Sequence, residues 1–526
     1  MRTPTFKLDR TTLPTSVESL RLSPVCLAAL VASGLAGVVP SASATPQGGT
    51  VTAGTATILT PKAGQMEIRQ GSNAASIAWR SFSIGANESL RIVQPSSQAV
   101  LVNRVIGDDP SQILGRLDAN GRVFLSNPRG ILFGRDAVVD VGGLLATTLA
   151  ISGVGSQYSL SGGSEAPGSI VVEGQLRAPG GLLAFAGPQI TLGGQLEAQR
   201  VAAAAVNAVH IDIDGDGLVF FKPRNDEQLD AKLKVLGTIK ADGGVVDLRA
   251  AARAGLADTV LNMDGLVQAR TIGTRNGQVF INGGAVGDTV ITGKIDVSGA
   301  ATGERGGEVR VLGERVELFG SALIDASGAA GGGLVHVGGG FQGQGEPLNA
   351  SMTVVGARAS IQASATDKGD GGQVVVWADG HTTFAGSIEA RGGVRGGDGG
   401  RVETSGKQTL NFKGQVNTLA PQGKTGTLLL DPSDITISTD ANDADDDGLG
   451  GFTGSTDSSV LNTTTLQTAL ATNNVTVDAT AGGANGSGSI TIVDPVSWSS
   501  VRSLTLKASS AITVEAGAGI SNAGTG

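Results

Sequence analysis

The sequence predicts an all-β protein built as a parallel β-helix, a solenoid in which short strands stack from one turn of the chain onto the next. Similar segments recur from residue 239 onward, at spacings of 28, 28, 29, 37 and 27 residues. Each segment reads as a short apolar strand, a glycine-rich turn and a second strand with alternating valines. A recurrence of this length is typical of a solenoid, and the sequence lacks the 3.6-residue apolar period that would favour helical repeats.

Each repeat begins with an aliphatic residue that we expect to face the interior and to stack on its counterpart in the next repeat. These residues are Ile239, Val267, Ile295, Ile324, Ile361 and Ile388, with looser copies at Leu176 and Leu196. Variable stretches such as 299–306 and 392–400 should fall at turns, where the coil can bulge without interrupting the stack. Upstream, alternation predicts inward positions for Ile77, Trp79, Phe82 and Ile84. After an acidic interruption at 440–451, apolar residues at 466–470, 475–477 and 490–492 resume the pattern.

The composition limits the kind of interior that the chain can form. Its 526 residues include 82 glycines, and aromatic residues make up only 3%. Alanine, valine, leucine and isoleucine must supply the apolar interior, which suits a thin core between closely stacked strands. A collagen helix is excluded because glycine does not recur at every third position. A disordered chain is excluded because 40% of the residues are hydrophobic and only 16% are charged.

Residues 1–44 predict a cleaved signal peptide. A positively charged leader precedes an apolar run at 25–39, and an Ala-x-Ala motif ends at Ala44, so we expect cleavage between Ala44 and Thr45. A membrane anchor is the alternative, but this run is shorter than the ~20 apolar residues that a spanning helix needs. Cleavage would remove Cys26, the only cysteine, and a leader charge of +2, which changes the formal net charge from −9 to −11. The acidic balance argues against nucleic acid or an anionic membrane surface as the main partner.

The densest set of turn signals lies at 103–148, where short apolar runs alternate with Gly, Pro and Asn. Asn127, Pro128 and Gly130 occupy the first, second and fourth positions of a type I turn. In such a turn, proline presets φ and the asparagine side chain can close onto the backbone. The pattern therefore predicts a tight corner of the coil.

This stretch resembles the N-terminal secretion domain of two-partner secretion exoproteins, the filamentous-haemagglutinin group. The residues that follow the family order include Asn103, Arg104, Pro110, Ser111, Gly115, Asn120, Gly121, Asn127, Pro128, Gly130, Ile131, Phe133 and Gly134. Arg129 departs from the family's usual Asn-Pro-Asn-Gly-Ile turn. The second family signature, Asn-Pro-Asn-Leu, is absent, which points to the large adhesins of the group rather than its haemolysin-like members. The resemblance is strong over about 45–150 and looser beyond.

The resemblance implies a right-handed β-helix with an N-terminal cap, comprising a secretion domain at 45–290 and a glycine-rich shaft at 291–526. It implies that an outer-membrane transporter recognises the motif residues and that the chain folds outside a Gram-negative cell. The other interpretation is that these residues only form a corner. The expected product is a secreted surface adhesin, not integral to a membrane, with a glycan or protein receptor.

Alternative functions are the stalk of a secreted toxin, a contact-dependent inhibition protein or a haem-capture protein. In these alternatives the active part would lie beyond residue 526. The chain stops in mid-repeat without the polar cap that a solenoid needs, so we expect it to be either the front part of a longer protein or a truncated reading of one.

Residues that could bind a metal are few, and no cofactor is expected. His210, His336 and His381 fall in different repeats without metal-ligand spacing. Two acidic loops match the start of a calcium loop but lack the glutamate at its twelfth position. The loops are Asp212, Asp214 and Asp216, and Asp443, Asp445 and Asp447. Calcium binding at the second loop is one hypothesis, and a solvated acidic turn is the other.

Parallel β-helices also include polysaccharide-degrading enzymes, which need clustered carboxylates in one groove. Asp296, Asp325 and Glu389 are the candidate acids. Asp296 and Asp325 occupy equivalent repeat positions beside a strand, which is typical of a repeated turn edge. We therefore expect that the protein is not an enzyme.

Overall fold

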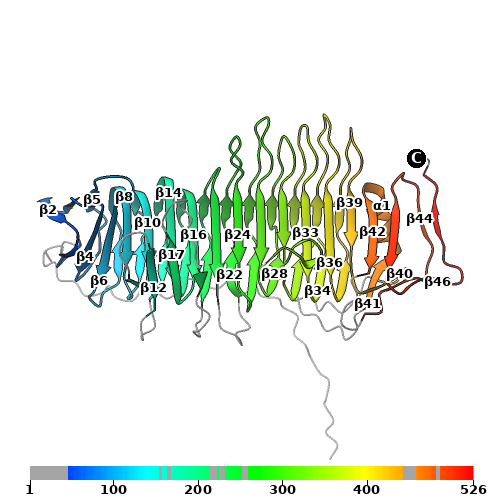
Figure 1. The fold of residues 1–526 in the computed structure, drawn as a ribbon, viewed down its shortest axis with the longest axis horizontal. Helices are drawn as coiled ribbons and strands as arrows, with labels where there is room; N and C mark the ends of the chain where they lie inside the picture. Colours follow the sequence, from blue (N-terminus) through cyan, green and yellow to red (C-terminus); the bar gives the residue numbers. More distant parts are fainter. Residues whose placement is uncertain are drawn as a thin grey trace, which may run out of the picture. The chain divides into compact units, whose positions relative to one another are not determined.

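The chain divides into two units, Met1–Ala42 and Ser43–Gly526, and the second carries the fold. The computed structural model describes residues 45–152, 157–162, 168–212, 222–223, 231–251, 259–346, 348–441, 458–480 and 486–524. The predicted signal peptide at 1–44 lies outside these described residues. The second unit is a parallel β-helix in which the strands of the coil pair in parallel with their counterparts one turn later, as predicted (Figure 1).

Each turn of the coil, here called a rung, passes through three ladders of stacked strands. The first ladder contains β20 (Thr238–Lys240), β23 (Leu266–Gln268), β26 (Lys294–Asp296), β29 (Leu323–Asp325), β32 (Ser360–Gln362), β35 (Ser387–Glu389) and β38 (Gln415–Asn417). The second contains β21 (Val245–Ala250), β24 (Gln278–Asn282), β27 (Glu308–Leu312), β30 (Leu334–Val337), β33 (Gln373–Ala378), β36 (Arg401–Gly406), β39 (Thr427–Leu430), β42 (Asn474–Ala479) and β45 (Leu504–Ala508). The third contains β7 (Ser111–Ile113), β9 (Ile131–Phe133), β13 (Ile170–Val172), β15 (Gln189–Leu192), β19 (Lys232–Val235), β22 (Thr259–Met263), β25 (Asp288–Ile291), β28 (Arg315–Leu318), β31 (Met352–Val355), β34 (His381–Phe384) and β37 (Thr409–Phe412).

In the N-terminal rungs, single long strands bend from the first ladder into the second. These strands are β8 (Arg116–Ser126), β10 (Val138–Thr147), β14 (Gln175–Gly187) and β16 (Gln195–Ala205). Before them, β3 (Gln65–Gln70) and β5 (Ser89–Val93) lead into the first ladder, and β4 (Ala74–Trp79) and β6 (Val100–Val105) into the second. Two antiparallel strands cap this end: β1 (Thr50–Ala53) pairs with β4, and β2 (Ala56–Lys62) pairs with β3.

The aliphatic residues that the repeat predicts to stack are paired in register along the first ladder. Leu176 lies beside Leu196, Leu196 beside Ile239, and the pairing continues through Ile388. None of these side chains is more than 1% exposed. Burial of one such side chain is worth ~1.5–3 kcal/mol, so each added rung contributes favourable free energy. Upstream, Ile77, Trp79, Phe82 and Ile84 are also buried, as predicted.

The variable stretches lie at turns, as predicted. Residues 299–306 separate β26 from β27, and 392–400 separate β35 from β36. Neighbouring turns of this kind are hydrogen-bonded to each other: the Gly299 amide donates to the Ser327 carbonyl oxygen at 2.9 Å, and the Gly393 amide to that of Gly369 at 3.0 Å. We call this row the loop ridge (272–275, 299–305, 328–331, 365–370, 392–398 and 420–425), and its loops project along one side of the coil (Figure 1).

The longest repeat places its extra length elsewhere. Between β30 and β31 the chain makes an excursion at 338–350, which includes the short helix η1 (Phe341–Gly343) and is described except at Pro347. The excursion covers the outward face of the second ladder. Its Gln342 amide donates to the carboxylate of Glu403 at 2.9 Å, and Arg401 lies 4.7 Å from the centre of the Phe341 ring.

The expectation of a strand at 466–470 is wrong. These residues lie in α1 (Thr463–Thr472), which packs against β38 of the first ladder. Asn462 caps the helix, accepting hydrogen bonds from the backbone amides of Thr464 and Thr465. Leu466 and Leu470 are fully buried because their spacing of four residues places them on one face of a helix.

Beyond β39 the coil continues with further parallel pairs. One sheet contains β40 (Asp434–Ser438), β41 (Ser458–Asn462), β43 (Ser489–Ile492) and β46 (Ala511–Val514). Another contains β44 (Val496–Trp498) and β47 (Ile520–Asn522). The strands predicted at 475–477 and 490–492 are present as β42 and β43.

An antiparallel sheet that the sequence did not predict covers the outside of the N-terminal rungs. It contains β11 (Ala150–Ser152), β12 (Gln157–Ser161), β17 (Ala208–Asp212) and β18 (Lys222–Pro223). A second apolar cluster lies beneath it, in which the rings of Phe124 and Tyr158 meet edge to face at 5.2 Å.

Candidate secretion site

The motif residues lie on two consecutive rungs of the N-terminal part of the coil. The first of these rungs runs through β5, β6 and β7, and the second through β8 and β9. Because these strands stack in parallel, the corner between β6 and β7 lies beside the corner between β8 and β9.

Asn127 joins these two corners. Its side chain is fully buried, and its Nδ2 donates to the carbonyl oxygen of Asp109 and to Oγ of Ser111, both at 3.0 Å. Its Oδ1 accepts from the backbone amide of Arg129 at 2.9 Å, and its carbonyl oxygen accepts from the Gly130 amide at 3.1 Å. The tight corner and the closure of the asparagine onto the backbone are as the sequence predicts. The two bonds to the preceding rung are additional.

Two of the motif glycines are required by the close approach of neighbouring rungs. Gly130 has a φ of +119°, and a Cβ there would lie 3.2 Å from the carbonyl oxygen of Ser169. A Cβ at Gly115 would lie 2.2 Å from the carbonyl oxygen of Gly85. Any larger residue at either position would force the rungs apart or strain the corner.

Asn103 is a polar residue inside the coil. It stacks between Ile77 and Leu125 on the neighbouring rungs and is fully buried. Its Oδ1 accepts from Nε1 of Trp79 at 3.0 Å, and its Nδ2 donates to the Phe124 carbonyl oxygen at 3.3 Å. Both ends of the amide are therefore satisfied, as buried polar groups require.

A polar column follows the bend between the first and second ladders over three rungs. Nε2 of Gln94 donates to Oε1 of Gln70 at 3.0 Å. One rung later, Oδ1 of Asn120 accepts from the backbone amide of Gln94 at 2.7 Å, and Nδ2 of Asn120 donates to the backbone carbonyl oxygen of Gln94 at 2.9 Å. Asn120 was among the predicted site residues, whereas the contribution of Gln70 was missed. The signal that could have predicted it is the spacing of Gln70 and Gln94 by about one rung, with Gln70 at the end of β3 and Gln94 directly after β5.

Arg104 connects the coil to the antiparallel sheet. Its Nε donates to the carbonyl oxygen of Ile151 at 3.3 Å, and its guanidinium also bonds to Oγ of Ser76. The other motif residues divide into two groups. Ser111, Ile131, Phe133 and Gly134 are buried together with Gly121, while Pro110 and Pro128 are exposed.

The exposed part of the corner carries Ile106, which is 74% exposed, and an ion pair between Arg129 and Asp108. The guanidinium and the carboxylate are 2.8 Å apart, but both groups are largely in solvent, so the pair contributes little stability. The arrangement presents no pair of catalytic groups. It supplies buried links between two rungs and an exposed corner that a partner could contact.

The acids considered for an enzyme lie on the outward face of the first ladder. Asp296 pairs in register with Asp325, and Glu389 follows two rungs later in the same column. Burial tends to raise the pKa of Asp296, but hydrogen bonds from Ser298 and Arg270 together hold that pKa below its usual value. Asp296 is thus an ionised residue fixed at a turn edge, and a general acid would need the opposite shift.

The buried acids with strongly raised pKa values lie close to the excursion. Burial raises the pKa of Glu403 to about 7, against the opposing effect of the hydrogen bond from the Gln342 amide. Burial and, to a smaller extent, the negative charge of Asp478 raise the pKa of Asp431 to about 7. These groups pack beneath residues 338–350, outside the motif rungs.

The histidines show no metal-binding arrangement in the described part of the chain. His336 contacts a carboxylate oxygen of Glu346 at 2.7 Å, and His381 contacts Oγ1 of Thr409 at 2.5 Å. Across the described residues, no three His, Cys, Asp or Glu side chains are grouped to hold a metal ion. The candidate calcium residues Asp443, Asp445 and Asp447 lie outside the described ranges, as do Asp214 and Asp216 and the side chain of His210.

Comparison of the sequence with known protein families identifies the class of protein to which this chain belongs. The family model of the TPS secretion domain matches residues 42–311, just over half of the chain, and the chain belongs to this family of two-partner secretion exoproteins. Proteins of this family are secreted by Gram-negative bacteria with the help of an outer-membrane transporter. Where the structure describes the chain, it contains no helix long and apolar enough to cross a membrane.

Particular relatives come from Haemophilus influenzae. The crystal structure of the HMW1 secretion domain superimposes with a TM-score of 0.62 at 28% identity, covering 73% of this chain and 100% of that chain. One heme/hemopexin-binding protein is 50% identical over 95 residues, and another, from strain ATCC 51907 / DSM 11121 / KW20 / Rd, is 37% identical over 140 residues. The matched stretches are 18% and 26% of this chain but only 10% and 15% of those two relatives.

Proposed function

We propose that residues 103–134 are the segment by which the outer-membrane transporter recognises this chain, and that they also form the first stable rungs outside the cell. The observation that carries the proposal is Asn127, whose buried side chain bonds two successive corners together. A chain that emerges unfolded needs a nucleus in which early rungs hold each other. Later rungs can then add one at a time, and the free energy of their burial favours outward movement.

The proposed order of parts follows from this role. Residues 1–44 direct the chain across the inner membrane and are removed after Ala44, so that the mature protein begins at Thr45. Residues 45–290 engage the transporter, and 291–526 form the start of a repetitive shaft. The fully stacked register of the first ladder supports a shaft that extends by addition of rungs.

The shaft serves adhesion in this proposal. It presents the loop ridge, whose backbone hydrogen bonds between neighbouring loops give it a fixed shape without a bulky core. A surface that repeats along the coil suits contact with a host or bacterial surface, because many weak contacts act together.

A second candidate is capture of haem or hemopexin. It is favoured by the relatives named as heme/hemopexin-binding proteins, which match this chain at 50% and 37% identity. Immobilised hemin and immobilised hemopexin would separate the two candidates. Retention of the purified chain on either matrix favours capture, and attachment to cells without such retention favours the adhesin.

Export is tested by expressing the gene with and without its transporter in a Gram-negative host. We expect the protein in the medium or on the cell surface only when the transporter is present, and in the periplasm otherwise. Asn127→Ala should reduce the exported amount several-fold, whereas Asn417→Ala, in the shaft, should leave it unchanged. Undiminished secretion without the transporter would contradict the proposed route.

A further inference from the structure

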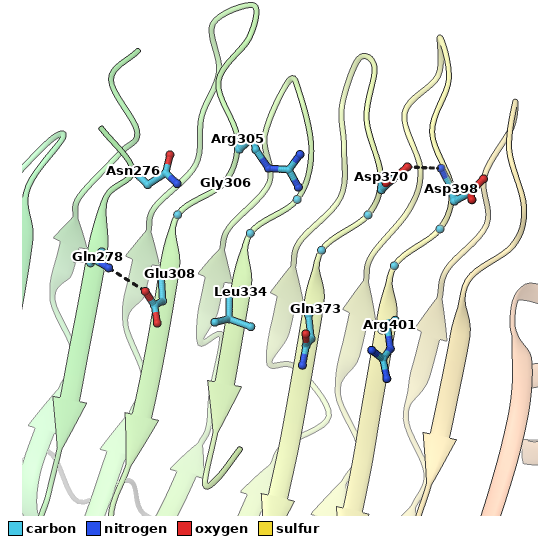
Figure 2. Close-up of a pocket in the computed structure, with 17 residues that line it drawn as sticks. Asn276, Gln278, Arg305, Gly306, Glu308, Leu334, Asp370, Gln373, Asp398 and Arg401 are labelled. Carbon is cyan, nitrogen blue, oxygen red and sulfur yellow. Dashed lines mark hydrogen bonds between the residues drawn. The ribbon is translucent and has the colours of Figure 1, made fainter. Parts of the chain in front are cut away.

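A groove follows the base of the loop ridge across five rungs, the first at the end of the secretion domain and the other four in the shaft. It lies between the ridge and the outward face of the second ladder, where strands β24, β27, β30, β33 and β36 begin (Figure 2). Its volume is about 570 Å³, which falls within the ~300–1,000 Å³ of typical small-molecule sites. The groove is open along the coil, so its shape suits an elongated ligand.

Stacked glycines keep the groove free of side chains. Gly307, Gly333, Gly372 and Gly400 occupy the same position on successive rungs. A Cβ at any of them would lie 2.1–2.2 Å from the carbonyl oxygen of the equivalent glycine one rung earlier. Only glycine fits there, and the groove has a flat floor at every rung.

One side chain per rung borders this floor, at the first residue of each second-ladder strand. In order these residues are Gln278, Glu308, Leu334, Gln373 and Arg401. Asn276, which directly follows the first segment of the ridge, and the ridge residues Asp370 and Asp398 face them across the groove (Figure 2). The lining thus presents one side chain per rung, comprising two amides, one carboxylate and one guanidinium, with the apolar Leu334 at its centre.

The carboxylates that line the groove already form hydrogen bonds or ion pairs within the protein. Glu308 accepts from Nε2 of Gln278 at 2.8 Å and pairs with Arg310. Asp370 accepts from the backbone amide of Asp398 at 2.7 Å, and Asp398 accepts in turn from that of Lys424 at 2.8 Å. The groups that remain to bind a ligand are the side-chain amides of Asn276 and Gln373 and the guanidinium of Arg401, which also stacks on the Phe341 ring, and the lining has no strong excess of either charge.

The spacing of these groups decides which polymer fits. Neighbouring rungs are ~4.8 Å apart, close to the length of one sugar in an extended glycan, so five rungs span about 19 Å. An extended polypeptide repeats its side-chain direction every ~6.6–6.8 Å and would fall out of step within two rungs. Nucleic acid would need a basic groove to neutralise its phosphates, which this groove lacks.

We propose that this groove binds a linear, uncharged glycan that lies along the coil, with about one sugar on each rung and four to five sugars in contact. Hydroxyl groups both donate and accept, and they match the amides of Asn276 and Gln373 and the guanidinium of Arg401. The inference rests on the proposed adhesive function and names its ligand class. Each groove binds weakly, and the many copies of the protein on a cell surface raise the overall affinity.

The test measures the binding of defined glycans to the purified chain by saturation-transfer NMR and calorimetry. The probes are β1→4-linked N-acetylglucosamine and α1→4-linked glucose oligomers of two to eight sugars. A heparin tetrasaccharide and an unstructured ten-residue peptide represent the competing ligand classes. We expect at least one neutral series to bind about tenfold more tightly as a tetramer than as a dimer, with little further gain beyond five sugars.

The variants are Asn276→Ala and Gln373→Ala, matched by Gln362→Ala as the control. Gln362 lies on β32 of the same rung as Gln373 but on the first ladder, across the loop ridge from the groove. Each groove variant should weaken tetramer binding at least threefold, and the control should not. Binding of neither neutral series, a loss in the control as large as in the variants, or tighter binding of the peptide or the heparin fragment would each overturn the proposal.

Adherence of cells that display the protein separates this inference from the proposed function. If the wild type adheres and the Asn276→Ala/Gln373→Ala double variant adheres equally well, the groove is not the adhesive site and the adhesin proposal stands. If the wild type does not adhere although neutral glycans bind in the groove with the expected length dependence, the adhesive function fails and the groove assignment stands.

Discussion

Replacing Asn127 by alanine should destabilise the N-terminal rungs by much more than loss of an ordinary turn residue. The substitution removes two hydrogen bonds to the preceding corner and one to the backbone amide of Arg129. Ser111 is fully buried, so its hydroxyl loses a partner that water cannot readily replace. The carbonyl oxygen of Asp109 and the amide of Arg129 belong to exposed residues and can bind water instead.

The expected loss in the free energy of unfolding follows from which of these groups are buried and which can bind water. Leaving one buried polar group without a partner costs ~1–3 kcal/mol, and each of the other two bonds contributes ~0.5–1.5 kcal/mol. We therefore expect the free energy of unfolding to fall by about 2–6 kcal/mol. Asn127→Asp should be similarly harmful, because a carboxylate keeps the bond from the Arg129 amide but can no longer donate to the oxygen of Asp109.

Urea denaturation of the purified chain, followed by tryptophan fluorescence, measures this loss, since Trp79 is buried in the adjoining rungs. Asn417 provides the matched control. Its Oδ1 also accepts from the amide two residues later, that of Leu419, at 3.1 Å. Asn417→Ala should cost only about 1 kcal/mol, because it removes a bond within one turn.

A double-mutant cycle with Ser111→Ala tests the proposed contact itself. The two substitutions should be non-additive by about 1 kcal/mol or more, since either one removes the Asn127–Ser111 bond. Additive effects, or an Asn127→Ala cost no larger than that of the Asn417 control, would refute the reasoning.

Three further predictions concern other parts of the chain. Glu403 is ionised in the unfolded chain above its ordinary pKa of 4.5 but stays protonated in the folded protein up to about pH 7. Glu403 alone should therefore lower the free energy of unfolding by ~1.4 kcal/mol per pH unit over that interval, about 3 kcal/mol in total. Asp431, whose pKa is also raised to about 7, adds a dependence of its own, so Glu403→Gln should remove only part of the slope in urea titrations at several pH values. Gly130→Ala should cost about 1–3 kcal/mol by the same assay, because alanine is strained at a φ of +119°. If the second acidic loop binds calcium, millimolar calcium should raise the melting temperature of the wild type but not of a variant carrying Asp443→Asn, Asp445→Asn and Asp447→Asn.

Each of these predictions has a contradicting result. An unchanged pH dependence in the Glu403 variant would mean that other groups dominate the titration. Wild-type stability of Gly130→Ala would show that the corner can relax around a side chain. An equal calcium response of the wild type and the triple variant would remove the calcium hypothesis.

The sequence was informative where one physical requirement repeats along the chain. Val267 and Ile295 must occupy the same phase of successive rungs to stack, so their spacing reveals the coil even though the loops between them vary in length. The turn at Asn127 was also visible, because Asn, Pro and Gly each have a local conformational preference. Local preference does not show which corner lies alongside, and the bonds from Asn127 to Asp109 and Ser111 could not be predicted from it.

Two other features of the fold could not be predicted from the sequence, for different reasons. The stretch at 466–470 contains apolar residues at a spacing that a short strand and a short helix both tolerate, and the cap at Asn462 decides for the helix. The excursion at 338–350 was detected only as a repeat of 37 residues. Its position between β30 and β31, rather than in the loop ridge, depends on tertiary contacts such as that of Gln342 with Glu403.

The central claim is that successive repeats stack in register as parallel strands, even where their spacing in the sequence changes. Paired cysteines test it most directly across the 37-residue repeat, where Leu323 lies beside Ser360. Stacked residues are ~4.8 Å apart, within the ~4.4–6.8 Å that a disulfide spans. In a background that carries Cys26→Ala, we predict rapid cross-linking of Leu323→Cys with Ser360→Cys and none with Ser351→Cys, the position 28 residues on. Cross-linking to position 351 instead of 360 would contradict the register and the coil that is built on it.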